Sequence, residues 1–121
     1  MNDETIRILL IEDNLDYARL IKQILTKKSP DAMDVEHHDT FAGGFDRAQR
    51  GEIDLILLDL DLPDSGNIDT LQAIKGATEV PIIVLTGTDD ENLALKAVRM
   101  GAQDYLMKGQ VDARLLVRSI R

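Results

Sequence analysis

The chain has 121 residues, which predicts one domain with a hydrophobic core of ordinary size. Its 22 acidic and 14 basic residues give a net charge of −8, and aromatic residues make up only 3%, so direct binding to nucleic acid is disfavoured. The sequence has no cysteine and no apolar run long enough to cross a membrane, so disulfides and thiolate metal sites are excluded and we expect a soluble, cytoplasmic protein.

Apolar periodicity divides the first fifty residues into two strand–helix pairs. Residues 6–11 read IRILLI and predict a buried strand, and apolar residues at helical spacing predict a helix over residues 15–27. Alternating apolar and polar residues over 33–37 predict a half-exposed strand. Thr40 is a typical helix N-cap, and we expect it to begin a short helix that ends at Gly51.

The same alternation continues through the second half of the chain. Residues 55–58 are four consecutive aliphatic residues, which is typical of a strand buried on both faces. A helix with one apolar face follows over 68–74, and we expect Gly76 to close it. A strand at 82–85 follows, and then a helix that we expect to begin with a capping box at Thr88 and Glu91 and to end at Gly101. The last predicted elements are a short strand at 105–107 and a helix that begins near Val111.

Five successive βα units predict an α/β fold with a five-stranded parallel sheet flanked by five helices, doubly wound in the flavodoxin-like manner. The sequence has no internal repeat, linker or low-complexity segment, so we expect residues 1–121 to form a single domain. Because the chain stops at Arg121 within a helical pattern, we expect this domain to have been cut from a longer, multidomain protein.

Polar residues follow four of the predicted strands, at the edge where open α/β sheets carry their ligand sites. They are Glu12, Asp13, Asp59, Thr86 and Lys108. Three carboxylates at close range repel one another, so they either raise a pKa or bind a cation such as Mg²⁺. A lysine and a hydroxyl can bind phosphate. Asp59 alone could simply cap a turn, but its companions at the same edge favour a functional site.

These residues lie in motifs that together resemble the receiver domain of two-component response regulators over essentially the whole chain. The motifs are Glu12-Asp13, LLDLDLP around Asp59, VLTG around Thr86, and GAQDYLMK ending at Lys108. The resemblance implies a phosphorylatable signalling domain in which Asp59 accepts a phosphoryl group from a phosphohistidine. The donor would be a sensor histidine kinase or a histidine phosphotransfer protein.

The resemblance also implies a metal site. Asp13, Asp59 and the backbone carbonyl of Asp61 would hold Mg²⁺, and Glu12 would act through water. The metal would help to neutralise the phosphoryl group that the Asp59 carboxylate must approach. Turnover would be confined to phosphorylation and dephosphorylation of the domain itself, so the protein would not otherwise be an enzyme.

The resemblance further implies a conformational switch. Thr86 and Lys108 would bind the phosphoryl oxygens, and Tyr105 would change rotamer together with Thr86. This local change would bias a surface built from the last two helices and the fifth strand. That surface would contact a downstream output module or effector protein, and it is also a candidate homodimer interface.

The sequence departs from the family pattern directly after the conserved lysine. Receivers usually have a cis proline after the lysine, but this chain has Gly109. Since a cis bond without proline costs about 3–4 kcal/mol, we expect a trans Lys108–Gly109 peptide in which glycine supplies unusual dihedral angles.

Three alternatives remain open at this point. Residues 59–61 also match the DxD motif of aspartate-nucleophile phosphatases, although Leu62-Pro63 follows and the chain is too short for a cap domain. A Mg²⁺-dependent nucleic-acid-cleaving domain is disfavoured by the negative charge. A receiver-like module that works without phosphorylation would lack a site residue, and none is missing.

His37-His38 could suggest a metal site, but neighbouring strand residues point to opposite faces, so we expect a solvated edge.

Overall fold

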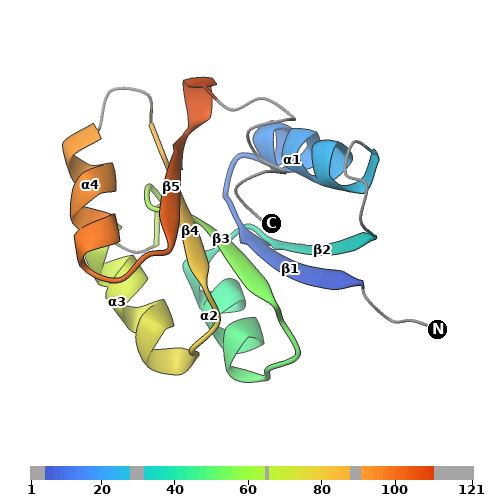
Figure 1. The fold of residues 1–121 in the computed structure, drawn as a ribbon, viewed down its shortest axis with the longest axis horizontal. Helices are drawn as coiled ribbons and strands as arrows, with labels where there is room; N and C mark the ends of the chain where they lie inside the picture. The colour runs from blue at the N-terminus through green and yellow to red at the C-terminus, as the bar shows by residue number, and fades with distance from the viewer. Residues whose placement is uncertain (1–4, 28–31, 65, 88–90, 111–121) are drawn as a thin grey trace.

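The computed structural model describes residues 5–27, 32–64, 66–87 and 91–110. Its centre is a five-stranded sheet in the order β2-β1-β3-β4-β5, with every neighbouring pair parallel (Figure 1). The strands are β1 (Ile6–Ile11), β2 (Met33–His38), β3 (Leu55–Asp59), β4 (Ile82–Thr86) and β5 (Asp104–Met107). This strand order is that of the flavodoxin-like doubly wound fold, so the predicted fold class is confirmed.

Helices cover both faces of the sheet. They are α1 (Leu15–Lys27), α2 (Phe41–Gln49), α3 (Asn67–Ala77) and α4 (Glu91–Arg99), and a 3₁₀ turn (Lys108–Gln110) follows β5. Helix α1 lies on one face, whereas α2, α3 and α4 lie on the other (Figure 1). The fifth predicted helix, from Val111, lies outside the described residues. Within the described ranges no helix is long and apolar enough to span a bilayer.

Each face of the sheet packs against its own hydrophobic cluster. In β1, Ile8 and Leu10 belong to the cluster beneath α1, whereas Leu9 and Ile11 belong to the cluster beneath α2, α3 and α4. Because successive strand residues point to opposite faces, a strand that is covered on both sides is apolar at every position. The central strand β3 is likewise buried throughout, and it carries Asp59 from the core to the edge of the sheet.

The ends of α2 agree with the sequence, the end of α3 does not, and the predicted Thr88 cap of α4 lies outside the described residues. Thr40 caps α2 by accepting a hydrogen bond from a first-turn amide at 3.1 Å, and Gly51 ends that helix region with φ of +80°. The prediction that Gly76 closes α3 is wrong, because the helix continues to Ala77 and ends where Thr78 becomes extended. A glycine in a last helical turn costs only about 1 kcal/mol relative to alanine, which is too little to end the helix by itself.

Candidate functional site

The carboxyl ends of four parallel strands meet at one edge of the sheet. Glu12 follows the last residue of β1, Asp59 ends β3, Thr86 ends β4 and Lys108 follows β5. The strand register aligns Asp59 with the penultimate residue of β4, and Thr86 with the last residue of β5. The structure therefore brings these predicted site residues to one end of the fold, and Asp13 lies beside Glu12 at the same end.

Three carboxylates form a tight cluster at this edge. One carboxylate oxygen from each of Glu12, Asp13 and Asp59 lies within 4.8 Å of the other two. Glu12 and Asp59 are fully buried, whereas Asp13 is exposed. Asp59 Oδ1 accepts a hydrogen bond from the Asp61 amide at 2.9 Å, and Asp59 Oδ2 has no hydrogen-bond donor among the described residues. A tight cluster of carboxylate oxygens fits a hard metal cation.

The Lys108 ammonium lies between the two buried carboxylates. Its Nζ is 2.8 Å from Glu12 Oε1, 2.9 Å from Glu12 Oε2 and 3.3 Å from Asp59 Oδ2. Burial lowers the pKa of Lys108, but the hydrogen bond from Lys108 to Glu12 and the charges of Asp59 and Glu12 outweigh that effect and raise it. Lys108 therefore stays charged and partly neutralises the acidic cluster.

The Asp59 carboxyl has a strongly perturbed pKa. Burial, followed by repulsion from Glu12, raises the pKa of Asp59 from 3.8 to about 7, although the Asp61 amide partly opposes the rise. In the metal-free protein the cluster therefore favours a protonated Asp59 at mildly acidic pH. A bound cation would favour the carboxylate instead.

Thr86 and Tyr105 lie on neighbouring strands. Thr86 is fully buried, and its hydroxyl donates to the Gly87 carbonyl at 3.4 Å, a long hydrogen bond that leaves the hydroxyl available for a better acceptor. Tyr105 is half-buried and packs against the cluster beneath α2, α3 and α4. No hydrogen bond or ion pair between described residues joins Tyr105 to Asp59 or Lys108.

The departure at Gly109 is accommodated by an ordinary helical turn. No peptide bond between described residues is cis, so the predicted trans Lys108–Gly109 bond is confirmed. The accompanying expectation of unusual dihedral angles is wrong. Within the described ranges, positive φ occurs at Gly51, Glu52 and Gly101, and residues 108–110 form a 3₁₀ turn. Such a turn needs no left-handed residue.

Tyr17 is a neighbour of the site that the sequence analysis missed. Its ring centroid lies 5.0 Å from Lys108 Nζ. The Asn14 side chain fixes this position, because Asn14 Oδ1 accepts the Tyr17 amide at 3.0 Å and so caps α1. The Asn14 amide in turn donates to Glu12 Oε2 at 3.0 Å. The sequence feature that could have identified Tyr17 is its position in the first turn of a helix that follows Glu12-Asp13 closely.

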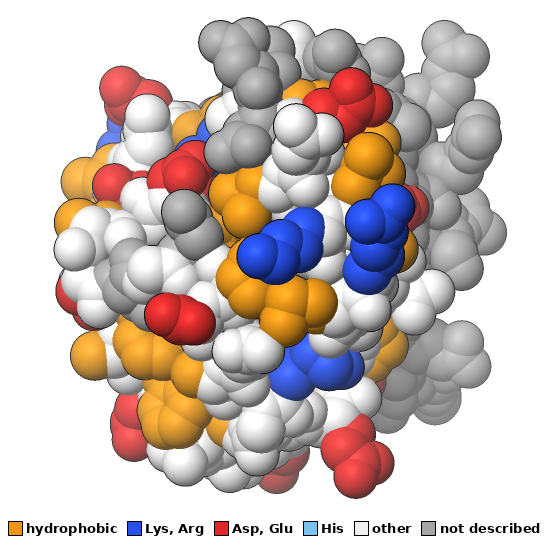
Figure 2. All heavy atoms as spheres, turned by 90° about the vertical axis from the view of Figure 1, so that its left-hand side faces the viewer, with side chains coloured by type: hydrophobic (Ala, Val, Ile, Leu, Met, Phe, Trp, Pro, Cys, Tyr) orange, Lys and Arg blue, Asp and Glu red, His pale blue; other side chains and the backbone are white. Residues whose placement is uncertain are grey.

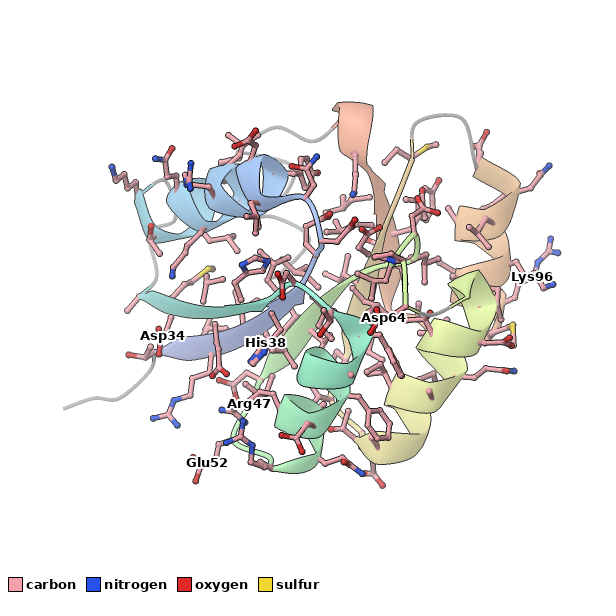
Figure 3. All side chains as sticks on the ribbon, turned by 180° about the vertical axis from the view of Figure 1, so that it is seen from behind. Asp34, His38, Arg47, Glu52, Asp64 and Lys96 are labelled. Atoms are coloured by element: carbon pink, nitrogen blue, oxygen red, sulfur yellow. The ribbon has the colours of Figure 1, made fainter. Side chains whose placement is uncertain are left out.

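The two histidines are hydrogen-bonded rather than simply solvated. His37 is half-exposed on the edge strand, and its Nε2 also donates to the Glu12 carbonyl at 2.7 Å. His38 Nε2 lies 2.7 Å from Glu36 Oε2, and Arg47 donates to the other Glu36 oxygen at 2.9 Å (Figure 3). Among the described residues neither histidine belongs to a metal-ligating cluster.

Asp64 ties the loop after β3 to the start of α2 (Figure 3). Its carboxylate accepts hydrogen bonds from the amides of Phe41 at 2.8 Å and Ala42 at 3.1 Å. The Phe41 amide is the main cause of the lowered pKa of Asp64. Since this loop begins directly after Asp59, the cap anchors the segment that leads away from the acidic cluster.

Comparison with known proteins agrees with the geometry. The family model described as the response regulator receiver domain matches residues 8–121. The KDP operon transcriptional regulatory protein KdpE of Escherichia coli is 34% identical over 114 residues, which cover 91% of this chain and 49% of that protein. The regulatory protein LuxO of Vibrio cholerae is 38% identical over 109 residues, which cover 89% of this chain and 23% of that protein. The chain thus spans at most about half the length of these two relatives.

Solved structures give the same result. A response regulator receiver domain from Clostridium thermocellum superposes with a TM-score of 0.84 at 29% identity, covering 95% of this chain and 90% of that chain. The signal receiver domain of a LuxO repressor protein from Vibrio parahaemolyticus superposes with a TM-score of 0.82 at 32% identity, covering 96% of this chain and 87% of that chain. The chain belongs to the response regulator receiver domain family.

Proposed function

We propose that this chain is the phosphorylatable receiver of a two-component or phosphorelay signalling protein and that Asp59 is the phosphoacceptor. The proposal rests mainly on the fully buried Asp59 carboxylate, whose Oδ2 lies 3.3 Å from Lys108 Nζ. Glu12 and Asp13 lie beside it in the acidic cluster. A structural ion pair would need one carboxylate for one lysine, whereas this edge concentrates three carboxylates.

The proposed chemistry is transfer of a phosphoryl group from a phosphohistidine. An Asp59 carboxylate oxygen attacks phosphorus, the P–N bond to the donor imidazole breaks, and the imidazole nitrogen keeps the electron pair. The product is an acyl phosphate on Asp59 and a free histidine on the donor. The Lys108 ammonium offsets negative charge on the phosphoryl oxygens, and the Thr86 hydroxyl donates a hydrogen bond to one of them.

Mg²⁺ is the proposed cofactor. The Asp13 and Asp59 carboxylates and the Asp61 backbone carbonyl would hold it, with Glu12 acting through water. Support comes from the close spacing of the carboxylate oxygens. When bound, the ion supplies positive charge that offsets the charge of the phosphoryl group.

The proposed output surface includes α4 and β5. Phosphoryl binding by Thr86 would change the end of β4 and the loop after it, and Tyr105 would respond on β5. Figure 2 shows apolar and basic side chains together on this side of the molecule. On α4 the exposed residues include Leu95 and Val98 beside Lys96 and Arg99. We propose that this surface contacts an output module, an effector protein or a second copy of the domain in the cytoplasm.

The experiment that tests the proposal is incubation with Mg²⁺ and acetyl phosphate, read by intact mass. We expect a mass gain of one phosphoryl group in the wild type and none in Asp59→Asn. Asp46→Asn is the matched control, because Asp46 is an exposed aspartate on α2, and it should gain mass like the wild type. No Asp59-dependent gain, together with hydrolysis of diverse phosphate esters, would favour an aspartate-nucleophile phosphatase.

The protein donor is expected to dock over the start of α1. Leu15 is 57% exposed and lies two residues after Asp13, so a partner that reaches Asp59 would cover it. We expect Leu15→Ser to slow phosphotransfer from a histidine-phosphorylated protein by about tenfold, because an apolar side chain is no longer buried in the complex. Phosphorylation by acetyl phosphate should stay within about twofold of wild type, since no docking is needed.

The control for that prediction is Leu20→Ser on the same helix. Leu20 is 49% exposed but lies more than one helical turn further from the acidic cluster. Its replacement should slow transfer from the protein donor less than Leu15→Ser does. Equal effects of Leu15→Ser on the two donors would argue against docking at this position.

A further inference from the structure

Four residues at the phosphorylation site form a closed ring of contacts. Glu12 Oε2 accepts the Asn14 amide, Asn14 Oδ1 accepts the Tyr17 amide, and the Tyr17 ring faces Lys108 Nζ at 5.0 Å. Lys108 closes the ring through its contacts of 2.8 and 2.9 Å with the Glu12 carboxylate. Tyr17 is the member of this ring to which neither the family resemblance nor the proposed chemistry assigns a role.

Lys108 needs a positional restraint because it has two competing carboxylate partners. Its Nζ lies closer to Glu12, at 2.8 Å, than to Asp59, at 3.3 Å. A lysine side chain has several rotatable bonds, so an ammonium attracted mainly to Glu12 would spend less time beside Asp59. A ring face within about 6 Å of an ammonium attracts it and blocks the space on that side.

We infer that Tyr17 is a positioning residue whose ring holds the Lys108 ammonium beside Asp59, ready to receive the phosphoryl group. This role rests on the proposed phosphorylation of Asp59. The Tyr17 ring is itself anchored, because its backbone is held by the Asn14 cap and its side chain packs against the cluster beneath α1. The ring is thus part of the rigid framework, whereas the lysine is the part that it restrains.

The ring rather than the hydroxyl carries this role. The Tyr17 hydroxyl is buried and has no hydrogen-bond partner among the described residues, so it donates to neither carboxylate. Burial, then the charges of Glu12 and Asp59, raise the pKa of Tyr17 to about 12. At neutral pH the hydroxyl is therefore uncharged and adds no negative charge to the acidic cluster.

Two substitutions separate the ring from the hydroxyl. Tyr17→Phe keeps the ring face, and we expect phosphorylation by acetyl phosphate with Mg²⁺ to stay within about twofold of the wild-type rate. Tyr17→Leu removes the ring, and we expect the rate to fall roughly fivefold to tenfold. Rates are normalised to the folded fraction measured by circular dichroism, so that a loss of stability is not counted. Equal rates for Tyr17→Leu and wild type, or equal losses in Tyr17→Leu and Tyr17→Phe, would overturn the inference.

A double-mutant cycle tests whether Tyr17 acts through Lys108. If it does, Tyr17→Leu should have little effect on the rate once Lys108 has been replaced with methionine. A purely structural role of Tyr17 would give the same fold-loss in both backgrounds, and that result would contradict the inference.

A spectroscopic measurement tests the contact without relying on phosphorylation. The chain has two tyrosines and no tryptophan, so Tyr105→Phe leaves Tyr17 as the single tyrosine. In that background Lys108→Met should change the fluorescence emission spectrum of Tyr17. Lys22→Met, which replaces an exposed lysine of α1, should leave the spectrum unchanged. If the wild type took up no phosphoryl group, the proposed function would fail while this measurement still reported on the contact. An unchanged emission spectrum would count against the contact itself.

Discussion

Replacing Lys108 with methionine is expected to slow phosphorylation of Asp59 by about a hundredfold to a thousandfold, the usual cost of removing one preorganised charge-stabilising donor. The physical reason is that the Asp59 carboxylate must approach an anionic phosphoryl group. Lys108 is the only cation within 4 Å of Asp59 among the described residues, at 3.3 Å. In Lys108→Met, the negative charge that develops during phosphoryl transfer is no longer offset by the Lys108 ammonium.

The measurement for this prediction is the rate of mass gain with acetyl phosphate and Mg²⁺. Lys108→Arg keeps the positive charge but changes the shape of the charged group. The rate of this variant should therefore lie between the rates of Lys108→Met and wild type. Lys22→Met is the matched control, because Lys22 is an exposed lysine on α1 and its loss should leave the rate unchanged. A Lys108→Met rate within about threefold of wild type would remove Lys108 from the proposed chemistry.

The second large effect is on stability, and its direction is opposite to that of most substitutions in a protein interior. In metal-free protein at pH 7.5 or above, Asp59→Asn is expected to be more stable than wild type, by on the order of a few kcal/mol. The wild type must hold the Asp59 charge in a buried cluster beside Glu12, whereas asparagine carries no charge. The loss of an ion pair with Lys108 offsets part of this gain.

The pH dependence of this difference follows from the raised pKa. Unfolded Asp59 titrates near 3.8, whereas folded Asp59 titrates near 7. Between these values the unfolded state binds fewer protons, so the contribution of Asp59 to stability falls as pH rises. The stability difference between Asp59→Asn and wild type should therefore grow from about pH 4 to about pH 7 and then level off.

Urea unfolding with EDTA at a series of pH values measures the difference. Added Mg²⁺ should stabilise the wild type and reduce the advantage of Asp59→Asn, because a ligand that binds only the folded state raises its stability. Asp46→Asn, which removes an exposed charge, should show no such pH dependence. If Asp59→Asn were less stable than wild type without metal at pH 7.5, burial and repulsion from Glu12 would not be the cause of the raised pKa of Asp59.

Most of the fold and the central group of the site could be predicted from sequence, because both depend on short-range patterns. Apolar runs mark the strands, and the first polar residue after such a run lies at the edge of the sheet. This places Glu12, Asp59 and Thr86 together once the strands are known to be parallel. Lys108 follows the last strand by the same logic, and its contacts with Glu12 join residues 96 positions apart.

The remaining contacts depend on loop geometry and helix rotation, which apolar periodicity does not specify. Tyr17 faces Lys108 because the Asn14 cap sets where the first turn of α1 begins. His37 reaches the Glu12 carbonyl only because β2 pairs with β1 in the observed register. Asp64 caps a helix 23 residues earlier in the chain, and no local signal in the sequence connects the two.

The identity of the phosphoacceptor is tested most directly by trapping the acyl phosphate. After incubation with acetyl phosphate and Mg²⁺, reduction with borohydride converts a phosphorylated aspartate to homoserine, and peptide sequencing by mass spectrometry locates it. We expect homoserine at position 59, at the buried end of β3 beside Lys108. Homoserine at position 13 or 61, with Asp59 unmodified, would contradict the assignment of Asp59 as the phosphoacceptor.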